Sequence, residues 1–439
     1  MSAEASSRST RGTRGPAGTL SVTLAGAGVV LPGPGAACTD LATFFEVVGA
    51  GRSCLAPYDQ PGLPLRIAGT VGAWDEQAAT GLDERRLART SRAARMALAA
   101  VRSALADAAL CAADLSDERS LLVACSLQFA SPEFEDYHAT IAAEGPAALG
   151  MRYWMTGTPA SVVGTVASSL GTGCPTLSVA GSCNVALRAV HLVHQLLLAG
   201  EIDRAVVVGV DTTVDPVFVA GTSFEGRSGY RASSLSDDPR DVRPHDRVQS
   251  GNATGEGAVA VVLERTSLTA RIDRPALRVL AATSRSNGPS AVATGPPDNV
   301  VADVLSLLDR SGRGLGDVAF LSDYADGNRF VEDHFCDALL GVRRRTGHDD
   351  ELLVTNQEAV FGHVAGTGGL VKLISAVQML ADGRVAPSAG CLTPYERLLA
   401  RPVGAAGTPH DGDAALVVTS GAGGDATSML LQLEGGTLR

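Results

Sequence analysis

The chain has 439 residues, of which 45% are hydrophobic, 19% charged and only 4% aromatic. This length is enough for two or three average domains or for one duplicated unit. The formal net charge of -11 would repel a polyanion, so we expect no binding to nucleic acid. An acidic partner would need a local basic patch, and the arginine-rich stretches at 85–95 and 343–345 are either such patches or solvated helix faces.

Residues 1 to about 17 are rich in Ser, Arg and Gly and lack the apolar core of a signal peptide, which indicates a disordered tail. No run of about 18 apolar residues occurs, so we expect no membrane span. The eight cysteines are scattered, without a CxxC pair or a histidine at metal-ligand spacing. This pattern argues against a disulfide framework and a metal site, and it favours a cytoplasmic protein.

In chain order, buried strands alternate with helices. The expected strands are 21–31, 120–125, 175–179, 205–210, 257–263, 277–282, 318–322, 414–419 and 428–432. The expected helices are 83–110, 184–198, 299–308, 331–340 and 370–380. This alternation predicts an α/β architecture, and two similar series of elements indicate an internal duplication.

Cys183 stands out because it follows a buried strand and precedes a helix that is apolar almost all round. A cysteine at a helix N-terminus is favoured as the thiolate by the helix dipole and the free N–H groups, which can also hold an oxyanion. This is the strand–turn–helix arrangement of a nucleophile. The alternative is a buried, inert cysteine that packs as a small hydrophobic residue.

Several motifs follow one another in a characteristic order. Residues 178–191 read SVAGSCNVALRAVH, and the helix that they begin ends in GEID at 200–203. Residues 243–251 read RPHDRVQSG, 255–258 read GEGA, 361–372 read FGHVAGTGGLVK, and 419–426 read TSGAGGDA. With AGAGVVLP at 25–32 and the arginine-rich helix, the chain resembles the β-ketoacyl synthase family of the thiolase superfamily from about residue 19 to about residue 434.

The resemblance implies a thiolase-like duplicated α-β-α-β-α layered sandwich, usually dimeric, with halves at 18–270 and 271–439. It implies that Cys183 takes an acyl group from the phosphopantetheine of an acyl carrier protein, or from CoA. His363 matches the second histidine of the family and would polarise a carbonyl or stabilise an enolate. The oxyanion hole would use the backbone N–H groups of Cys183 and Ala422, with Gly421 and Gly423 beside them. No metal or organic cofactor bound to the protein is implied.

Two departures from the family motifs concern the condensation step. The first histidine motif should follow the strand at 318–322, but the chain reads DYADGNRF there, so Asp326 or Ala325 stands where the histidine is expected. The Lys-Ser-Asn before the second histidine is replaced by Glu358-Ala-Val. Acids would repel a developing carbanion, which puts decarboxylative condensation in doubt. Asp326 or Glu358 would instead orient His363 or act as a base, unless each is simply a solvated loop acid.

Four readings remain open. The first is an acyltransferase of polyketide or fatty-acid-type biosynthesis, since acyl transfer needs only a nucleophile, a base and an oxyanion hole. The second is a condensing enzyme that replaces the lost histidine by His334 or a water. The third is a non-catalytic partner subunit, like the chain length factors, although these lack the nucleophilic cysteine. The fourth is a thiolase, which would need a second cysteine within 419–427, where none occurs.

The resemblance also bears on the pocket and on the partners. The family commonly has a Phe at the position of Ala422, so the small side chain predicts a wider pocket for an unusual or bulky acyl group. The expected partners are an acyl carrier protein and a second subunit, which is either another copy of the chain or a related ketosynthase.

Overall fold

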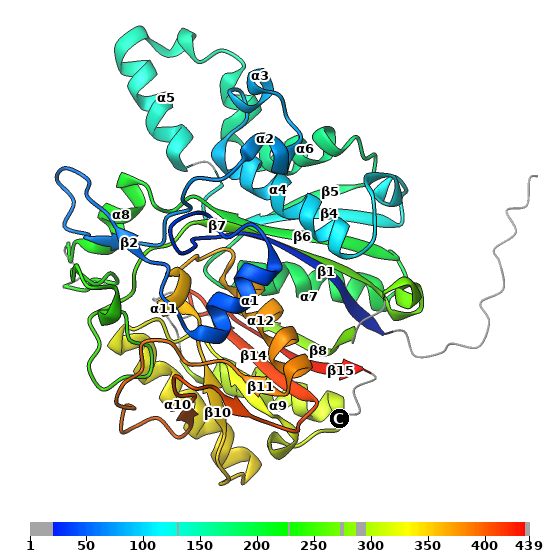
Figure 1. Ribbon diagram of the computed structural model, residues 1–439, viewed down its shortest axis with the longest axis vertical. Helices are drawn as coiled ribbons and strands as arrows, with labels where there is room; N and C mark the ends of the chain where they lie inside the picture. The colour runs from blue at the N-terminus through cyan, green and yellow to red at the C-terminus, as the bar shows by residue number, and fades with distance from the viewer. Residues whose placement is uncertain (1–20, 130, 227–228, 273–275, 287–295, 435–439) are drawn as a thin grey trace, which may run out of the picture.

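The computed structural model describes residues 21–129, 131–226, 229–272, 276–286 and 296–434 (Figure 1). The tail expected at 1–17 therefore lies outside the described residues. The main strands are β1 (Val22–Val30), β4 (Ser120–Ser126), β5 (Thr176–Ala180), β6 (Arg204–Asp211), β7 (Gly257–Arg265), β8 (Ala276–Arg285), β9 (Phe320–Ser322), β10 (Leu353–Thr355), β12 (Arg401–Pro402), β14 (Ala414–Ser420) and β15 (Ala426–Glu434). Short pairs are β2 (Ala56–Pro57) with β3 (Ile67–Ala68), and β11 (Arg384–Val385) with β13 (Thr408–Pro409).

The helices occupy the segments between the strands. They are α1 (Leu41–Ala50), α2 (Glu76–Thr80), α3 (Glu84–Leu87), α4 (Arg92–Asp107), α5 (Ser131–Glu144), α6 (Pro159–Leu170), α7 (Val185–Leu198), α8 (Pro216–Ser223), α9 (Asp298–Ser311), α10 (Arg329–Thr346), α11 (Glu358–Phe361) and α12 (Gly368–Asp382). The elements expected from the sequence pattern are thus present, with ends that differ by a few residues.

Within the described part of the chain, eleven strands share one hydrogen-bonded sheet in the order β12-β10-β9-β14-β15-β8-β1-β7-β6-β4-β5. One end of this order consists of β1, β4, β5, β6 and β7. The other end consists of β8, β9, β10, β12, β14 and β15. The two ends are joined by antiparallel pairing of β1 with β8 at 22–24 alone. This division is what a duplicated unit requires, and the boundary near residue 270 stays a prediction.

The sheet and the helices form the layers of the thiolase-like fold (Figure 1). Helices α4 and α6 cover the outer face of the first end of the sheet, and α9 and α10 cover the outer face of the second. Helices α7 and α12 contact each other and lie between the two ends. Because most of the surface of α7 and α12 is covered, both helices are largely apolar, and α7 keeps one exposed position at Leu192.

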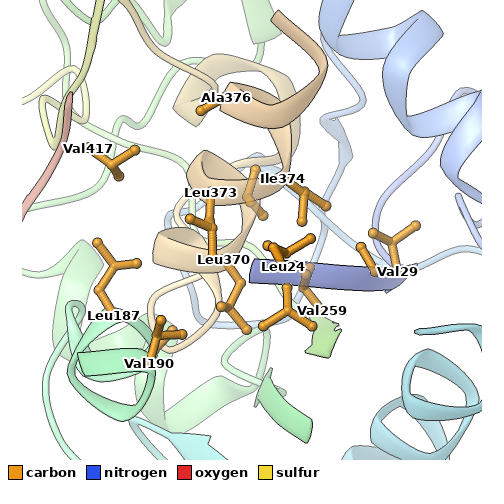
Figure 2. Close-up of a cluster of buried hydrophobic side chains, with 14 of the residues drawn as sticks. Leu24, Val29, Leu187, Val190, Val259, Leu370, Leu373, Ile374, Ala376 and Val417 are labelled. Atoms are coloured by element: carbon orange, nitrogen blue, oxygen red, sulfur yellow. The ribbon is translucent and has the colours of Figure 1, made fainter. Parts of the chain in front are cut away.

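The core of this middle layer is shown in Figure 2. Side chains of α7 and α12 pack against strands from both ends of the sheet, namely Leu187, Val190, Leu370, Leu373 and Ile374 against Leu24, Val29, Val259 and Val417. Full burial of each large aliphatic side chain contributes about 1.5–3 kcal/mol. The N-termini of the two central helices are thereby held in fixed positions by the core of the molecule.

The expected single helix over 83–110 is wrong in one respect. The structure has two helices, α3 and α4, separated at residues 88–91. Ser91 ends the break by accepting a hydrogen bond from the backbone N–H of Ala94 at 3.2 Å. A serine side chain in this position satisfies a backbone donor at the start of a helix, and this favours a new N-terminus over a continuous helix.

In the described residues, no helix is long and apolar enough to cross a membrane. All eight cysteines are free thiols. No group of three or more His, Cys, Asp or Glu side chains in the same part of the chain is arranged to hold a metal ion.

Candidate active site

Cys183 lies in the turn between β5 and α7, two residues before the helix begins. The turn is closed by the N–H of Val185, which donates to the carbonyl of Ser182 at 2.9 Å. Cys183 is partly exposed, unlike Cys125, which is fully buried. An accessible sulfur thus lies beside the N-terminus of α7.

His363 reaches the same sulfur from the other half of the chain. Its Nε2 lies 3.2 Å from the Sγ of Cys183, across 180 residues of sequence. The backbone N–H of His363 donates to the carbonyl of Ala253 at 2.6 Å, and Gly362 before it has a φ of 80°, which favours glycine. The imidazole is thus fixed by its own backbone, while 21% of its side chain stays exposed.

Behind His363 stands a buried ion pair. The Oε2 of Glu358 lies 3.1 Å from Nδ1 of His363, and its Oε1 lies 3.2 Å from Nζ of Lys372. Burial alone would raise the pKa of Glu358, but Lys372 and His363 outweigh it and lower the pKa to about 2. Glu358 is therefore a carboxylate, and it is one of the two acids proposed from sequence to orient His363.

The protonation of His363 follows from these neighbours. Burial of the imidazole would lower its pKa, but Cys183 and Glu358 raise the pKa well above the usual value. The imidazole of His363 is thus held between the sulfur of Cys183 and the carboxylate of Glu358. Cys183, His363 and Glu358 therefore form a continuous series within hydrogen-bond distance, which is the geometry that a nucleophile, a base and an orienting acid require.

Asp326 lies near this series without a direct hydrogen bond to it among the described contacts. It is buried, and its carboxylate accepts hydrogen bonds from Nδ2 of Asn252 at 2.8 Å and from the N–H of Asn328 at 3.0 Å. Burial raises the pKa of Asp326, while the charge of His363 opposes that rise. Of the two acids proposed from sequence, Glu358 takes the orienting position and Asp326 stands beside the pair as a buried, hydrogen-bonded group.

His334, the proposed substitute for the missing histidine, makes a different contact. Its Nδ1 lies 2.7 Å from the hydroxyl of Tyr324, and the two rings meet edge to face. Burial lowers the pKa of His334 and favours the neutral imidazole. Within the described contacts, the side chain of His334 touches neither Cys183 nor His363.

The Gly-rich loop between β14 and β15 lies against the nucleophile turn. A Cβ on Gly421 would come within 2.1 Å of the Oγ of Ser182, so only glycine allows this approach. Arg188 of α7 forms an ion pair with Asp425 of the loop at 2.8 Å, which ties the loop to the helix. Ala422 and Gly423 are exposed at the rim. The structure thus places the loop where the expected oxyanion hole requires it, and the role of its N–H groups stays a prediction.

Sequence reasoning missed two side chains of this site. Lys372 is a single charge within the apolar run of α12, and a buried lysine needs a charged partner, so this pattern could have revealed it. Tyr230 lies near the nucleophile, where burial, Asp326 and Cys183 raise its pKa to about 12. No local pattern around Tyr230 distinguishes it from an ordinary loop tyrosine.

Comparisons with known proteins agree with this arrangement. The model of the β-ketoacyl synthase N-terminal domain matches residues 21–268, which is more than half of the chain. The tetracenomycin polyketide synthase ketoacyl synthase alpha subunit of Streptomyces glaucescens is 26% identical over 379 residues, which cover 82% of this chain and 85% of that protein. Erythronolide synthase EryA3 of Saccharopolyspora erythraea is 30% identical over 242 residues, which are 53% of this chain but only 7% of that protein.

Solved structures show the same fold at lower identity. The ishigamide ketosynthase/chain length factor superimposes with a TM-score of 0.83 at 22% identity, covering 95% of this chain and 100% of that one. A β-ketoacyl synthase from Burkholderia phymatum STM815 gives a TM-score of 0.80 at 15% identity, with 94% and 99% covered. A type II acyl-carrier protein in complex with its ketosynthase bound to the hexaketide gives 0.80 at 16%, with 94% and 100% covered. The chain belongs to the β-ketoacyl synthase family.

Proposed function

We propose that this protein is a ketosynthase-like acyltransferase that loads an acyl group onto Cys183 and passes it to an acceptor in polyketide or fatty-acid-type biosynthesis. The observation that carries the proposal is the position of His363, 3.2 Å from the sulfur of Cys183 and 3.1 Å from the carboxylate of Glu358. A base that is oriented by an acid and contacts a thiol is the arrangement of an activated cysteine nucleophile.

The two half-reactions use only groups of this series. The thiolate of Cys183 attacks the thioester carbonyl, the bond from that carbon to the carrier sulfur breaks, and the departing thiolate takes the proton of the His363 imidazolium. An acceptor alcohol, amine or thiol then gives its proton to His363 as it attacks the acyl-cysteine, and the Cys183 thiolate leaves. Glu358 stays ionised throughout and stabilises the imidazolium.

The surroundings of the pair favour plain transfer over decarboxylative condensation. Asp326 or Ala325 stands where the family has its first histidine, and the carboxylate of Glu358 stands where the family has a lysine. The cation that the sequence appeared to lack is present as Lys372, but its ammonium contacts Glu358 rather than facing Cys183. A carbanion formed beside His363 would therefore face more negative charge, and fewer cations and hydrogen-bond donors, than in the family pattern.

The carrier and the subunit partner follow from relatives. One structural relative is an acyl-carrier protein complex, and another is a ketosynthase/chain length factor. We propose that the acyl group of this chain also arrives on the phosphopantetheine of a carrier protein or on CoA. The same comparison supports a dimer, either with a second copy or with a related ketosynthase subunit.

The deciding experiment follows the mass of the intact protein after incubation with acyl-carrier protein or acyl-thioesters of increasing chain length. We expect one acyl adduct that maps to Cys183, that is absent in Cys183→Ala and that persists in Cys391→Ala, because Cys391 is another partly exposed cysteine. Turnover of the adduct on an amine or alcohol supports transfer. Release of carbon dioxide with malonyl-carrier protein would instead establish condensation.

A second candidate is a chain-length-factor-like partner subunit without catalysis. It is favoured by the likeness to the ishigamide ketosynthase/chain length factor, and by the lack of the family's first histidine, in whose place Asp326 or Ala325 stands. The free and partly exposed thiol of Cys183 speaks against it. Absence of any adduct on Cys183, together with copurification with a ketosynthase subunit, would favour this candidate.

A further inference from the structure

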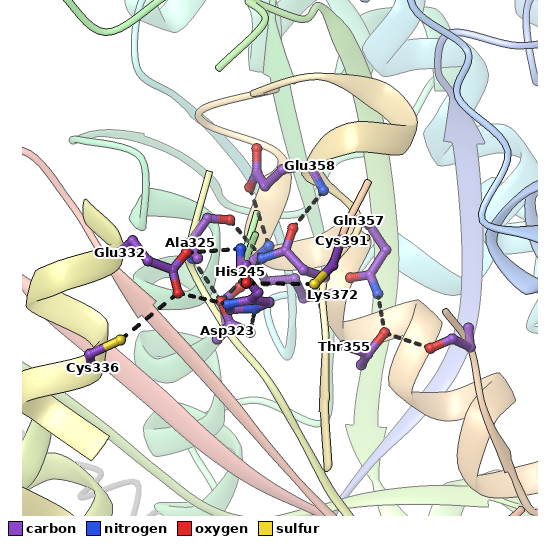
Figure 3. A network of polar contacts seen from close by, with 12 residues as sticks. His245, Asp323, Ala325, Glu332, Cys336, Thr355, Gln357, Glu358, Lys372 and Cys391 are labelled. Carbon is purple, nitrogen blue, oxygen red and sulfur yellow. Dashed lines mark hydrogen bonds and ion pairs between the residues drawn. The ribbon is translucent and has the colours of Figure 1, made fainter. Parts of the chain in front are cut away.

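His245 lies in a buried network of polar side chains (Figure 3). Its Nε2 lies 2.8 Å from Oδ2 of Asp323, and its Nδ1 lies 3.0 Å from Oε1 of Glu332. All three side chains are 0% exposed. The backbone N–H of His245 also donates to Oε2 of Glu332 at 2.9 Å. An imidazole with both nitrogens bonded to carboxylates can satisfy this geometry fully only when it carries two protons.

The charge balance of this site supports the same protonation. Burial would lower the pKa of His245, but the two carboxylates raise it to about 10. Gln249 donates to Glu332 at 2.9 Å, and the thiols of Cys336 and Cys391 face Glu332 and the carbonyl of His245. His245 also has a φ of 64°, a conformation that is strained for a residue with a side chain.

A line of hydrogen bonds connects this site to the candidate active site. Oδ1 of Asp323 accepts from the N–H of Ala325 at 2.7 Å and from Nδ2 of Asn356 at 3.1 Å. The same amide nitrogen donates to the carbonyl of Ala325 at 2.7 Å. Oδ1 of Asn356 accepts from the N–H of Glu358 at 2.9 Å. Asn356 therefore joins the anchored Asp323 to the first residue of α11, whose carboxylate orients His363.

We propose that His245 is a positioning residue that acts through Asp323 and Asn356 to hold Glu358 against His363, and this role rests on the proposed function of the Cys183 site. The proposal gives a role to a charged histidine that has no exposed surface. Without His245, Asp323 and Glu332 would be two buried carboxylates without a cation. Protonation or movement of Asp323 would relieve this unfavourable arrangement. Either change removes or weakens the acceptor that fixes Asn356.

The test measures the reactivity of Cys183, because the thiolate is the reactive form and His363 and Glu358 stabilise it. Full-length protein is treated with iodoacetamide at a series of pH values, and alkylation is assigned to Cys183 by peptide mass. The variants are His245→Phe, Asn356→Ala and their combination. His410→Gln is the matched control, since the imidazole of His410 donates only to the carbonyl of Met379, at 2.9 Å, among its described side-chain hydrogen bonds.

We expect each single variant to raise the pH midpoint of Cys183 alkylation by about one unit, and the combination to add little, because both break one line of contacts. The ionisable groups that face the Cys183–His363 pair, namely Glu358, Lys372, Asp326 and Tyr230, are unchanged in all of them. His410→Gln should keep the wild-type midpoint. Asn356→Ala leaves both ion pairs of His245 intact. If His245→Phe does not fold, the midpoint of Asn356→Ala therefore tests the proposed line of contacts.

A folded Asn356→Ala or His245→Phe protein with the wild-type midpoint would overturn the proposal, and so would fully additive shifts. Circular dichroism and thermal melting establish which variants are folded. Alkylation needs no acyl donor, so the result is independent of acyl loading. A protein that fails to load acyl groups but shows these shifts would refute the proposed function and leave the positioning role of His245 standing.

Discussion

His363 and His245 each contact a carboxylate, and they differ in the group that their second ring nitrogen contacts. His363 has Glu358 on one side and the thiol of Cys183 on the other, with 21% of its side chain exposed. His245 has a carboxylate on both sides and no exposure. Both have a raised pKa, for the same electrostatic reason.

The difference shows how one residue type serves chemistry or structure. A histidine whose two ring nitrogens both bond to fixed carboxylates has no nitrogen free to bind a substrate. Such a residue can only stabilise the structure around it. A histidine with one nitrogen on a movable proton of a thiol can exchange that proton during a reaction. Substitution of His363 should therefore mainly change the rate of acylation, and substitution of His245 should mainly change the free energy of unfolding. The following experiments test this difference, from the largest expected effect to the smallest.

The largest effect is expected for His363→Asn. Loss of the base should slow acylation of Cys183 by about 10²–10⁴-fold, because a positioned acid–base group contributes that much. Stability should change little, since the side chain is partly exposed. The measurement is the rate of adduct formation by intact mass, with urea unfolding beside it. A variant that loads acyl groups at the wild-type rate would remove His363 from the reaction.

His245→Phe should mainly cost stability. Removing one partner from a buried ion pair costs about 3–5 kcal/mol, and here two carboxylates lose their cation. We expect a large drop in the free energy of unfolding by urea titration, without the loss of rate seen in His363→Asn. The control is His410→Gln, which removes a histidine bonded to a carbonyl. An equally small loss in both variants would mean that the buried cluster does not stabilise the fold.

The double variant E358K/K372E keeps the buried ion pair but exchanges the charge that faces His363. The ion pair behind His363 is kept, so stability should stay within about 1–2 kcal/mol of wild type, but an ammonium now faces Nδ1. This should lower the pKa of His363 and reduce Cys183 alkylation near neutral pH by about tenfold. The control swap is E351R/R401E, an exposed pair that should leave both quantities unchanged. Undiminished alkylation in E358K/K372E would contradict the orienting role of Glu358.

The stability contributed by His245 should depend on pH in a defined direction. Its pKa is raised to about 10 in the folded protein, so its contribution is complete below the unfolded value of 6.5 and is lost as the pH rises toward 10. The stability gap between wild type and His245→Phe should therefore shrink by about 1–3 kcal/mol between pH 6.5 and pH 9.5. Urea titrations at the two pH values measure it, and a constant gap would show that His245 is not charged at neutral pH.

The smallest effect is expected for Ala422→Phe at the rim of the site. A phenyl ring there should slow loading of long acyl chains by about 3–10-fold relative to acetyl, because the added ring occupies space at the pocket mouth. The readout is the ratio of adduct formation for the two donors. A strict preference for acetyl in the wild-type protein would disprove the wider pocket.

Much of the fold was predictable because strands and helices bury their apolar faces with fixed periods. The strand at 22–30 and the apolar helices at 185–198 and 368–382 follow those periods, and they form the middle of the molecule. The break between α3 and α4 was missed because Ser91 acts as a helix cap only through its own backbone geometry. The nucleophile and His363 could be proposed because each lies in a local motif.

By itself, the sequence determined the order of elements and the thiolase-like architecture. It also identified Cys183 and His363, the two residues that are in contact at the candidate site. Only the tertiary structure decided that Glu358 is the acid in contact with His363, that Lys372 is its buried cationic partner, and that His245 lies between Asp323 and Glu332. The physical reason differs between the two sites. His245 lies 78 residues from Asp323 and 87 residues from Glu332 in the sequence, and only folding brings them together. Glu358, His363 and Lys372 are close in sequence, but the fold decides which of their side chains face one another. Such polar contacts depend on distance and burial in the folded chain, and no local period in the sequence encodes them.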